Sequence, residues 1–353
     1  MSRKPRLDPA IFNLPVAKMR EGYYSDKYFV RARDVLLRDK HRPRVTMQVF
    51  GKTDAYLGGA DEVIAILKLC AQSWEELAVS ALYDGDEVAP WETVMLIEGP
   101  YDAFAVLETL YLGVLARRTR VGTNTHRVVE AAKPKQVMFF PARHDHWLVQ
   151  TGDGYAAHIA GAIGVSTDAQ ASWWGSEGVG TVPHALIAAY GGDTVRASLK
   201  FAEHMDDPNI RLITLVDFDN DCVGTSLKVA RALGQRLYGV RIDTSETLVD
   251  QSIVPQMGLT KPTGVIPQLV WNVRRALDKE GFQQVKIVVS GGFTVEKIRL
   301  FEEQGVPVDI YGVGSSLFQG RFDFTADIVR VDGKPCAKVG RSFRPNPRLE
   351  RVE

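Results

Sequence analysis

Two neighbouring stretches decide the fold: VKIVVSGG at residues 285–292 and DIYGVGSS at residues 309–316. Each is a short apolar run that ends in glycine and serine, and residues 294–304 between them have a helical pattern. A continuous apolar strand followed by a helix is typical of a parallel sheet whose faces are covered by helices. The two stretches therefore predict consecutive βα units.

Three further apolar runs, at 136–140, 211–216 and 238–242, extend this pattern upstream. Helical patterns follow the last two, at 226–237 and 266–280. Repeated βα units predict an α/β fold built on a (β/α)8-like barrel, and chemically active residues collect at the C-terminal strand ends of such barrels.

The rest of the chain is expected to form an α+β domain. Residues 45–50 alternate as a half-buried strand does, and helical or strand patterns follow at 60–70, 93–97 and 103–117. We expect an N-terminal domain at 1–117, a barrel at 118–320 and a C-terminal segment at 321–353 that packs on the N-terminal domain.

Composition excludes several classes of protein. The 353 residues include 43 Lys+Arg and 43 Asp+Glu, and this zero balance argues against a basic nucleic-acid surface. No signal peptide is visible, and no uncharged apolar run approaches the ~20 residues of a membrane span. The 3 cysteines are far apart, as in a reducing compartment. We expect a cytoplasmic protein without a nucleic-acid or membrane partner.

The two glycine loops are candidate phosphate sites. Glycine lets backbone N–H groups approach an anion, a following helix N-terminus attracts negative charge, and the last two loops of a barrel frequently bind phosphate. Ordinary turn punctuation is the alternative. The candidate residues are Ser290, Gly291, Gly292, Gly312, Gly314, Ser315 and Ser316.

Acidic residues follow two other predicted strands. Asp217 and Asp219 suit Mg²⁺ bound with substrate phosphates, or sugar hydroxyls, although a solvated turn is the alternative. Arg241 and Asp243 point to the same side of their strand, where a substrate contact and a structural ion pair are both open. His184 opens a helical stretch after a glycine-rich segment, so it is either a phosphoryl acceptor or a structural cap.

Six motifs, in order along the chain, resemble those of the nicotinate phosphoribosyltransferase family, which has the type II phosphoribosyltransferase fold. Any single motif is weak, but six in register are specific. They are YYSDKYF at 23–29, FFPAR at 139–143, GVSTD at 164–168, GTVPH at 180–184, RIDTS at 241–245 and the pair of glycine loops.

The resemblance implies that nicotinate and phosphoribosyl pyrophosphate form nicotinate mononucleotide and pyrophosphate, in the synthesis of NAD. It implies that Phe140 stacks on the pyridine ring and that Tyr24 covers the opposite face, supplied by a second subunit of a homodimer or larger homo-oligomer. Arg143 and Arg241 would meet the nicotinate carboxylate or the pyrophosphate.

Further roles follow from the same resemblance. Asp217 and Asp243 would hold ribose hydroxyls or Mg²⁺–pyrophosphate, Thr181 would contact substrate, and the glycine loops would bind the 5′-phosphate. The resemblance also implies that ATP phosphorylates His184 and so couples its hydrolysis to nucleotide formation.

Substrate choice is expected to depend on Ser166. Relatives that act on nicotinamide carry an Asp near this position, whereas a hydroxyl can donate to a carboxylate, so the acid is favoured. Asp168 is close enough to be the aligned residue instead. Some short relatives carry a C-terminal cysteine zinc knuckle, but only Cys336 lies in this tail, so no zinc is expected.

Two other readings stay open. One is a type II transferase that acts on quinolinate or nicotinamide; quinolinate has a second carboxylate and would want a richer cationic cluster. The other is a phosphate-binding barrel without turnover, against which the joint presence of Asp217, Asp243 and His184 argues.

Overall fold

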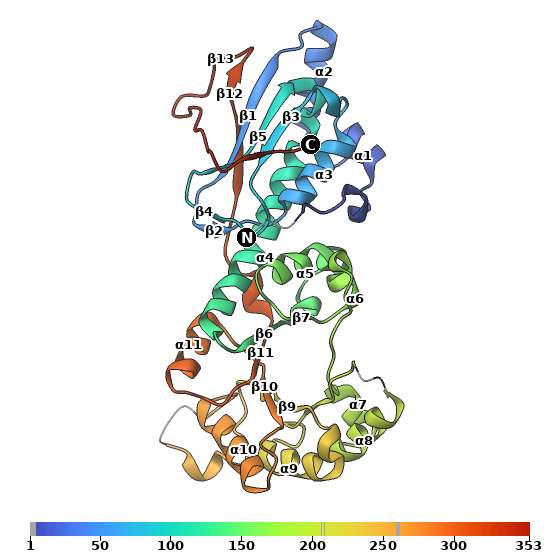
Figure 1. Ribbon diagram of the computed structural model, residues 1–353, viewed down its shortest axis with the longest axis vertical. Helices are drawn as coiled ribbons and strands as arrows, with labels where there is room; N and C mark the ends of the chain where they lie inside the picture. Colours follow the sequence, from blue (N-terminus) through green and yellow to red (C-terminus); the bar gives the residue numbers. More distant parts are fainter. Residues whose placement is uncertain (1–4, 206, 208, 259–261) are drawn as a thin grey trace. The chain divides into compact units, whose positions relative to one another are not determined.

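The computed structural model describes residues 5–205, 207, 209–258 and 262–353, which form two compact units (Figure 1). The N-terminal unit comprises Met1–Thr123 and Phe318–Glu353, and the barrel unit comprises Asn124–Leu317. Helix α4 (Glu108–Ala132) belongs to both units, and the domain boundary expected at 117/118 falls inside it.

The barrel unit is built on a parallel sheet with the strand order β7-β6-β11-β10-β9-β8. Its strands are β6 (Gln136–Phe139), β7 (Gly164–Val165), β8 (Ile213–Leu215), β9 (Gly239–Ile242), β10 (Lys286–Val289) and β11 (Ile310–Val313). In the register of the central strand β10, Val288 pairs with Arg241 on one side and Ile310 on the other. The expected barrel-like α/β fold is confirmed.

An extended segment, 179–182, joins the two edges of this sheet. The amide of Val179 donates to the Val165 carbonyl of β7 at 2.7 Å, and the amide of Val182 donates to the Ile213 carbonyl of β8 at 2.9 Å. The segment therefore takes a further strand position between β7 and β8, and it carries the residues that immediately precede His184.

Helices cover the outside of the sheet. In α10 the buried residues Leu269, Val270, Val273 and Leu277 recur at helical spacing and face the strands. Side chains cap several N-termini: Asp221 accepts from the Gly224 amide, and Thr294 from the Lys297 amide. The helices are α5 (Gln150–Ile159), α6 (Asp168–Ala171), α7 (His184–Ala189), α8 (Thr194–His204), α9 (Cys222–Leu233), α10 (Pro267–Lys279) and α11 (Val295–Glu303).

A small apolar cluster fills the middle of the barrel. Met138, Ile213, Val288 and Ile310, from four different strands, pack together, and Phe140 packs against them. Since alternate residues of a strand share a face, the next inward positions along these strands lie above the cluster, at the C-terminal edge.

The N-terminal unit is an antiparallel sheet with the order β13-β12-β1-β5-β3-β14 (Figure 1). Its strands are β1 (Arg44–Gly51), β3 (Ala78–Ala81), β5 (Thr93–Pro100), β12 (Phe324–Val331), β13 (Lys334–Pro335) and β14 (Glu350–Arg351), beside the pair β2 (Ala55–Tyr56) and β4 (Glu87–Val88). Helices α1 (Val16–Glu21), α2 (Lys27–Asp39) and α3 (Ala60–Cys70) accompany the sheet, with α3 in its core. Within the described residues, no helix has the length and apolarity to cross a membrane.

The expectation that strand 45–50 is half-buried is wrong. Its polar residues Thr46 and Gln48 are only 6% and 2% exposed. The C-terminal tail covers this face: the Gln48 side chain donates to the Ser342 carbonyl at 3.3 Å and accepts from the Arg344 amide at 2.7 Å. Alternation therefore marked two buried faces, of which one is polar and hydrogen-bonded.

Candidate active site

The C-terminal edge of the barrel gathers most of the predicted functional residues. Each stands among the last residues of a strand or in the segment that follows it. Because the strands are parallel, these ends lie at one edge of the sheet. The loops after β6, β8, β9, β10 and β11 and the closing segment supply them: Phe140, Arg143, Thr181, His184, Asp217, Arg241, Asp243, Ser290, Gly291, Gly292, Gly312, Gly314, Ser315 and Ser316.

His184 and Asp217 form a hydrogen-bonded pair. The His184 Nε2 atom lies 3.0 Å from Asp217 Oδ1, and the carboxylate is 7% exposed whereas the imidazole is 43% exposed. This bond raises the pKa of His184 above its ordinary value, burial opposes the shift, and the charges of Asp217 and Asp243 add to it. The pair thus presents a partly open imidazole oriented by a buried carboxylate.

Arg241 is held by three neighbours at once. Its Nε donates to Ser290 Oγ at 2.8 Å, and its terminal nitrogens donate to Thr181 Oγ1 at 3.4 Å and to Asp243 Oδ2 at 3.3 Å. Burial lowers the pKa of this guanidinium, while Asp243 and Asp217 oppose the shift. Arg241 and Asp243 therefore form the structural ion pair that the sequence allowed. Because both side chains remain partly exposed at the edge of the sheet, the alternative of a substrate contact also stays open.

Phe140 lies under this cation. The Arg241 guanidinium carbon is 5.0 Å from the centre of the Phe140 ring, so one ring face is occupied. A Cβ on Gly312 would lie 2.6 Å from the ring, so glycine is required for this close approach. A planar ligand that stacked on the Arg241 side of Phe140 would have to displace the guanidinium.

The first glycine loop turns sharply at Gly291 and Gly292, whose φ angles are +87° and +64°. Lys297, in the first turn of α11, donates to the Gly291 carbonyl at 3.1 Å. A Cβ on Gly292 would fall 1.8 Å from Glu246 Oε1, so a carboxylate rests against this loop. The loop therefore combines exposed backbone with one cation and one anion.

The second glycine loop is tied to the first. Ser316 Oγ donates to the Phe293 carbonyl at 2.8 Å, so its hydroxyl proton is used within the protein. Ser315 is exposed, and a Cβ on Gly314 would lie 2.9 Å from the His144 ring. Of the two serines, Ser315 is the one whose hydroxyl faces solvent.

Ser166 does not have the free hydroxyl expected of it. Its Oγ donates to the Phe139 carbonyl at 3.1 Å, which leaves oxygen lone pairs but no proton for a ligand. Asp168, the alternative residue, is exposed and accepts from the Gly178 amide at 2.9 Å. The argument that a serine hydroxyl donates to a substrate carboxylate is therefore not supported by this geometry.

Arg143 and Asp219 are exposed on the loops after β6 and β8. Arg143 lies near enough to Arg241 for its charge to oppose the second cation, and among the described residues it has no ion-pair partner. Tyr24 belongs to the N-terminal unit, where it is 44% exposed and packs edge-on against Tyr23.

The donor chemistry at this edge suits Mg²⁺ only in part. Asp217 and Asp243 are hard oxygen ligands, but no group of three or more His, Cys, Asp or Glu within the described part of the chain could hold a metal. Mg²⁺ is commonly bound by one or two carboxylates together with substrate phosphates. The two aspartates fit that mode, in which the phosphates complete the coordination.

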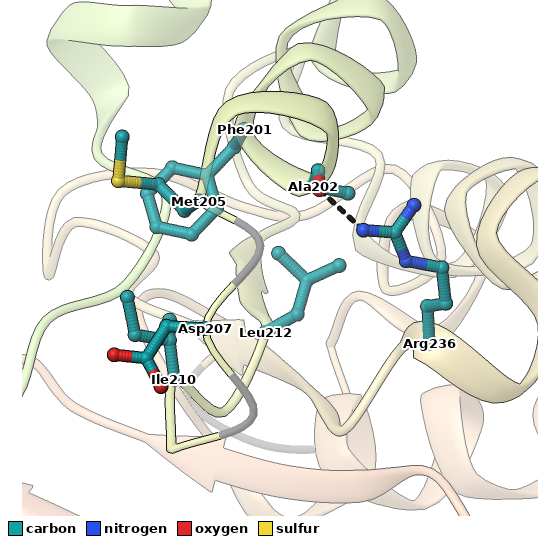
Figure 2. Close-up of a pocket in the computed structure, with 7 residues that line it drawn as sticks. All are labelled: Phe201, Ala202, Met205, Asp207, Ile210, Leu212 and Arg236. Carbon is teal, nitrogen blue, oxygen red and sulfur yellow. Dashed lines mark hydrogen bonds between the residues drawn. The ribbon is translucent and has the colours of Figure 1, made fainter.

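Two cavities are found in the barrel unit, one at the edge of this cluster and one away from it. One of about 520 Å³ borders the first glycine loop and includes Glu246, Gly292 and Lys297. The other, of about 350 Å³, lies at the N-terminal end of β8, whereas Asp217 follows the C-terminal end of that strand. Figure 2 shows this second cavity, where Arg236 donates to the Ala202 carbonyl; its lining is Phe201, Ala202, Met205, Asp207, Ile210, Leu212 and Arg236.

Sequence reasoning missed Glu246 and Lys297. Glu246 comes directly after the RIDTS motif, and Lys297 lies in the first turn of a helix that the sequence predicted at 294–304. The sequence therefore showed that both residues are close to predicted site residues along the chain. It did not show that the loop after β9, which carries Glu246, contacts the first glycine loop.

Comparison with known proteins identifies the family. A solved structure described as nicotinate-nucleotide pyrophosphorylase from Pyrococcus furiosus is 32% identical, covers 100% of this chain and 86% of that one, and has a TM-score of 0.80. The chain belongs to the type II phosphoribosyltransferase family. A family model described as the N-terminal domain of quinolinate phosphoribosyl transferase also matches residues 26–119 of this family member.

Curated relatives bear the name expected from the motifs. Nicotinate phosphoribosyltransferase of Mycobacterium tuberculosis is 30% identical over 75% of this chain, and that of Bacillus subtilis is 25% identical over 67%. The chain spans 56% and 45% of these two relatives, about half of their length. Human nicotinic acid phosphoribosyltransferase, at 16% identity and a TM-score of 0.69 over 88% of this chain and 75% of its own, shares the fold.

Proposed function

We propose that this protein is a nicotinate phosphoribosyltransferase, which converts nicotinate and phosphoribosyl pyrophosphate to nicotinate mononucleotide and pyrophosphate in the biosynthesis of NAD. The observation that carries the proposal is the cluster of His184–Asp217 with Arg241–Asp243 above Phe140, at the edge where this family of folds places its chemistry. The names of the relatives support the same substrate.

The reaction asks the protein to position two substrates and to stabilise a leaving group of high negative charge. The pyridine nitrogen attacks C1 of the ribose as the bond to pyrophosphate breaks. In our proposal the pyridine ring lies on the face of Phe140 opposite Arg241. The backbone amides of the glycine loops and Ser315 hold the 5′-phosphate.

Selection of the acid over the amide then depends on the arginines. Ser166 is committed to the Phe139 carbonyl, whereas Arg143 has no ion-pair partner within the described chain and can offer a carboxylate two parallel hydrogen bonds. We assign the nicotinate carboxylate to Arg143 and the pyrophosphate side to Arg241.

Mg²⁺ would offset the charge of the leaving pyrophosphate. Asp217 and Asp243 would hold it jointly with the pyrophosphate oxygens, as their donor chemistry allows. Their other contacts, to His184, Ser290 and Arg241, orient the carboxylates before substrate arrives.

ATP is proposed as a second substrate that phosphorylates His184. Because Nε2 faces Asp217, the nitrogen with the available lone pair is Nδ1, which would form a bond to the γ-phosphorus as ADP leaves. Water would later cleave the N–P bond and release phosphate. Asp217 would stabilise the imidazolium character that develops at the ring.

A second copy of the chain is proposed to complete the site. Tyr24 is exposed and would cover the outer face of the bound pyridine from the partner of a homodimer or larger homo-oligomer. Mixing a His184→Ala variant with a Tyr24→Ala variant tests this. Recovery of activity in the mixture supports shared sites, and two independently inactive variants that do not complement each other argue against them.

Quinolinate is the second candidate substrate, because the family model that matches residues 26–119 has that name. Its two carboxylates require two cationic partners. Arg143 is open at this edge, but Arg241 is already engaged by Asp243, and Glu246 adds negative charge nearby. The edge is thus better matched to one carboxylate.

One experiment separates these functions. The purified protein is incubated with phosphoribosyl pyrophosphate, Mg²⁺ and nicotinate, nicotinamide or quinolinate, with and without ATP, and pyrophosphate release is measured. Release with nicotinate, stimulated by ATP, is expected. Release with quinolinate and loss of CO₂ would favour the second candidate, and no release with any substrate would contradict catalysis altogether.

A further inference from the structure

Ser290 joins the cationic and anionic halves of the site. Its side chain is buried, at 3% exposure, although it opens a loop whose glycines reach the surface. Its Oγ donates to Asp243 Oδ1 at 2.6 Å and accepts from Arg241 Nε at 2.8 Å. A serine hydroxyl has one proton to donate, and here Ser290 donates it to the Asp243 carboxylate.

The register of the sheet explains this arrangement. β9 and β10 are parallel, with Ile242 opposite Val289, so Ser290 follows beside Asp243 on the adjacent strand. Arg241 and Asp243 share one side of β9 because strand side chains alternate. The Ser290 hydroxyl, directly after the end of β10, therefore reaches both charged groups.

The direct contact between Arg241 and Asp243 is weak by comparison. It is 3.3 Å long, whereas a charge-assisted N–H···O⁻ bond usually measures about 2.7–2.9 Å. The Thr181 contact, at 3.4 Å, is also long. The two short links in this network both pass through Ser290, so this hydroxyl decides where the guanidinium lies over Phe140.

We propose that Ser290 is a positioning residue, which orients Arg241 and Asp243 together through one bridging hydroxyl and is not a ligand of the substrate phosphate. The proposal rests on the function proposed above for this edge. It assigns the 5′-phosphate to the amides of Gly291 and Gly292 and to the second loop. The Ser290 side chain instead orients the charged groups that act on the transition state.

Three variants test the proposal. S290A removes the bridge, S290T keeps the hydroxyl, and S226A is the matched control, because Ser226 is a buried serine of α9 whose Oγ has no hydrogen-bond partner. We measure kcat and KM for phosphoribosyl pyrophosphate and nicotinate. The crystal structures of S290A and S290T give the position of Arg241 without reference to turnover.

We expect S290A to lower kcat roughly 10- to 100-fold, the fold-change that corresponds to the loss of a buried hydrogen bond to charged groups. KM for phosphoribosyl pyrophosphate should change less than about 3-fold, because a group that acts on the transition state leaves ground-state binding alone. S290T should recover most of kcat, S226A should match the parent, and Arg241 should leave Phe140 only in S290A.

Several outcomes would overturn the proposal. A rise in KM for phosphoribosyl pyrophosphate at unchanged kcat would make Ser290 a phosphate ligand. Unchanged Arg241 in the S290A structure, or an S290T variant as impaired as S290A although folded, would remove the bridging role. If the parent protein turns over none of the pyridine substrates, the proposed function fails, and the two crystal structures still decide whether Ser290 positions Arg241.

Discussion

At the scale of single residues, the site depends on side chains that fix one another before any substrate is present. Asp217 is almost buried and holds the imidazole of His184 by one nitrogen. Because this contact stabilises the charged imidazole, it raises the pKa of His184. Its behaviour with pH therefore reports directly on the geometry.

The Asp217→Asn variant removes the carboxylate and keeps the shape. The parent His184 should titrate above the ordinary 6.5, because the bond to Asp217 raises its pKa, and the variant should titrate lower. A pKa raised by folding contributes stability below the unfolded value of 6.5 that is lost as pH rises through the folded value. The variant should thus lose most stability below pH 6.5.

NMR titration of His184 and urea unfolding at several pH values check this prediction. A His184 midpoint that does not fall in Asp217→Asn, or a stability difference that grows with pH, would contradict the pairing.

Glu246 is a residue whose replacement should strengthen the binding of phosphoribosyl pyrophosphate. Its carboxylate rests against Gly292, so an incoming phosphate meets a like charge. Glu246→Gln should lower KM for phosphoribosyl pyrophosphate by about 3- to 10-fold, with the largest effect at low ionic strength, where charges are least screened. Steady-state kinetics at two salt concentrations measure it, and Glu203→Gln, an exposed substitution on α8, is the control. A higher KM would instead indicate that Glu246 supports the loop.

At the scale of elements, the strands and helices of the barrel were largely predictable and their contacts were not. The runs at 285–289 and 238–242 became β10 and β9 nearly in full, because buried parallel strands are continuous apolar sequences. The helix predicted at 103–117 is instead α4, which begins at Glu108 and continues to Ala132. Its polar second half weakened the apolar pattern that marked its first.

Site residues show the same division between identity and partners. Sequence placed Ser290 and Ser166 at the right edge, since strand ends can be read from the pattern. It could not show that Ser290 donates to Asp243 or that Ser166 donates to the Phe139 carbonyl, because each hydrogen bond joins residues of separate strands. Partners across strands depend on register, which a single strand does not specify.

The approach of β11 to Phe140 gives an element-scale prediction. A Cβ at Gly312 would overlap the ring, so Gly312→Ala should displace Phe140, destabilise the protein by about 1–3 kcal/mol and raise KM for nicotinate more than KM for phosphoribosyl pyrophosphate. Gly113→Ala is the control, because a Cβ there in α4 meets nothing within 4 Å. Urea unfolding and kinetics measure both effects, and equal changes in the two KM values would argue against stacking on Phe140.

At the scale of the whole molecule, the N-terminal unit is discontinuous in sequence, because the barrel unit is inserted between its two segments. Strand β12, from the end of the chain, pairs along the length of β1, and β14 pairs with β3 at the far edge. The last residues therefore complete the first sheet. Sequence could suggest that the tail packs back, but not that it buries a polar face.

Gln48 is where the tail and the first sheet are joined most directly. Its side chain is buried and makes part-buried hydrogen bonds to Ser342 and Arg344, so Gln48→Ala removes two hydrogen bonds and should lower the free energy of unfolding by about 1–3 kcal/mol. Gln283→Ala, which removes the bond of an exposed glutamine to the Asp278 carbonyl, should change stability by less than about 0.5 kcal/mol. We expect the first variant to lower the urea midpoint and to expose the tail after Arg341 to protease, and the second to do neither. Equal midpoints for the two variants would mean that the tail covers β1 without stabilising the protein through Gln48.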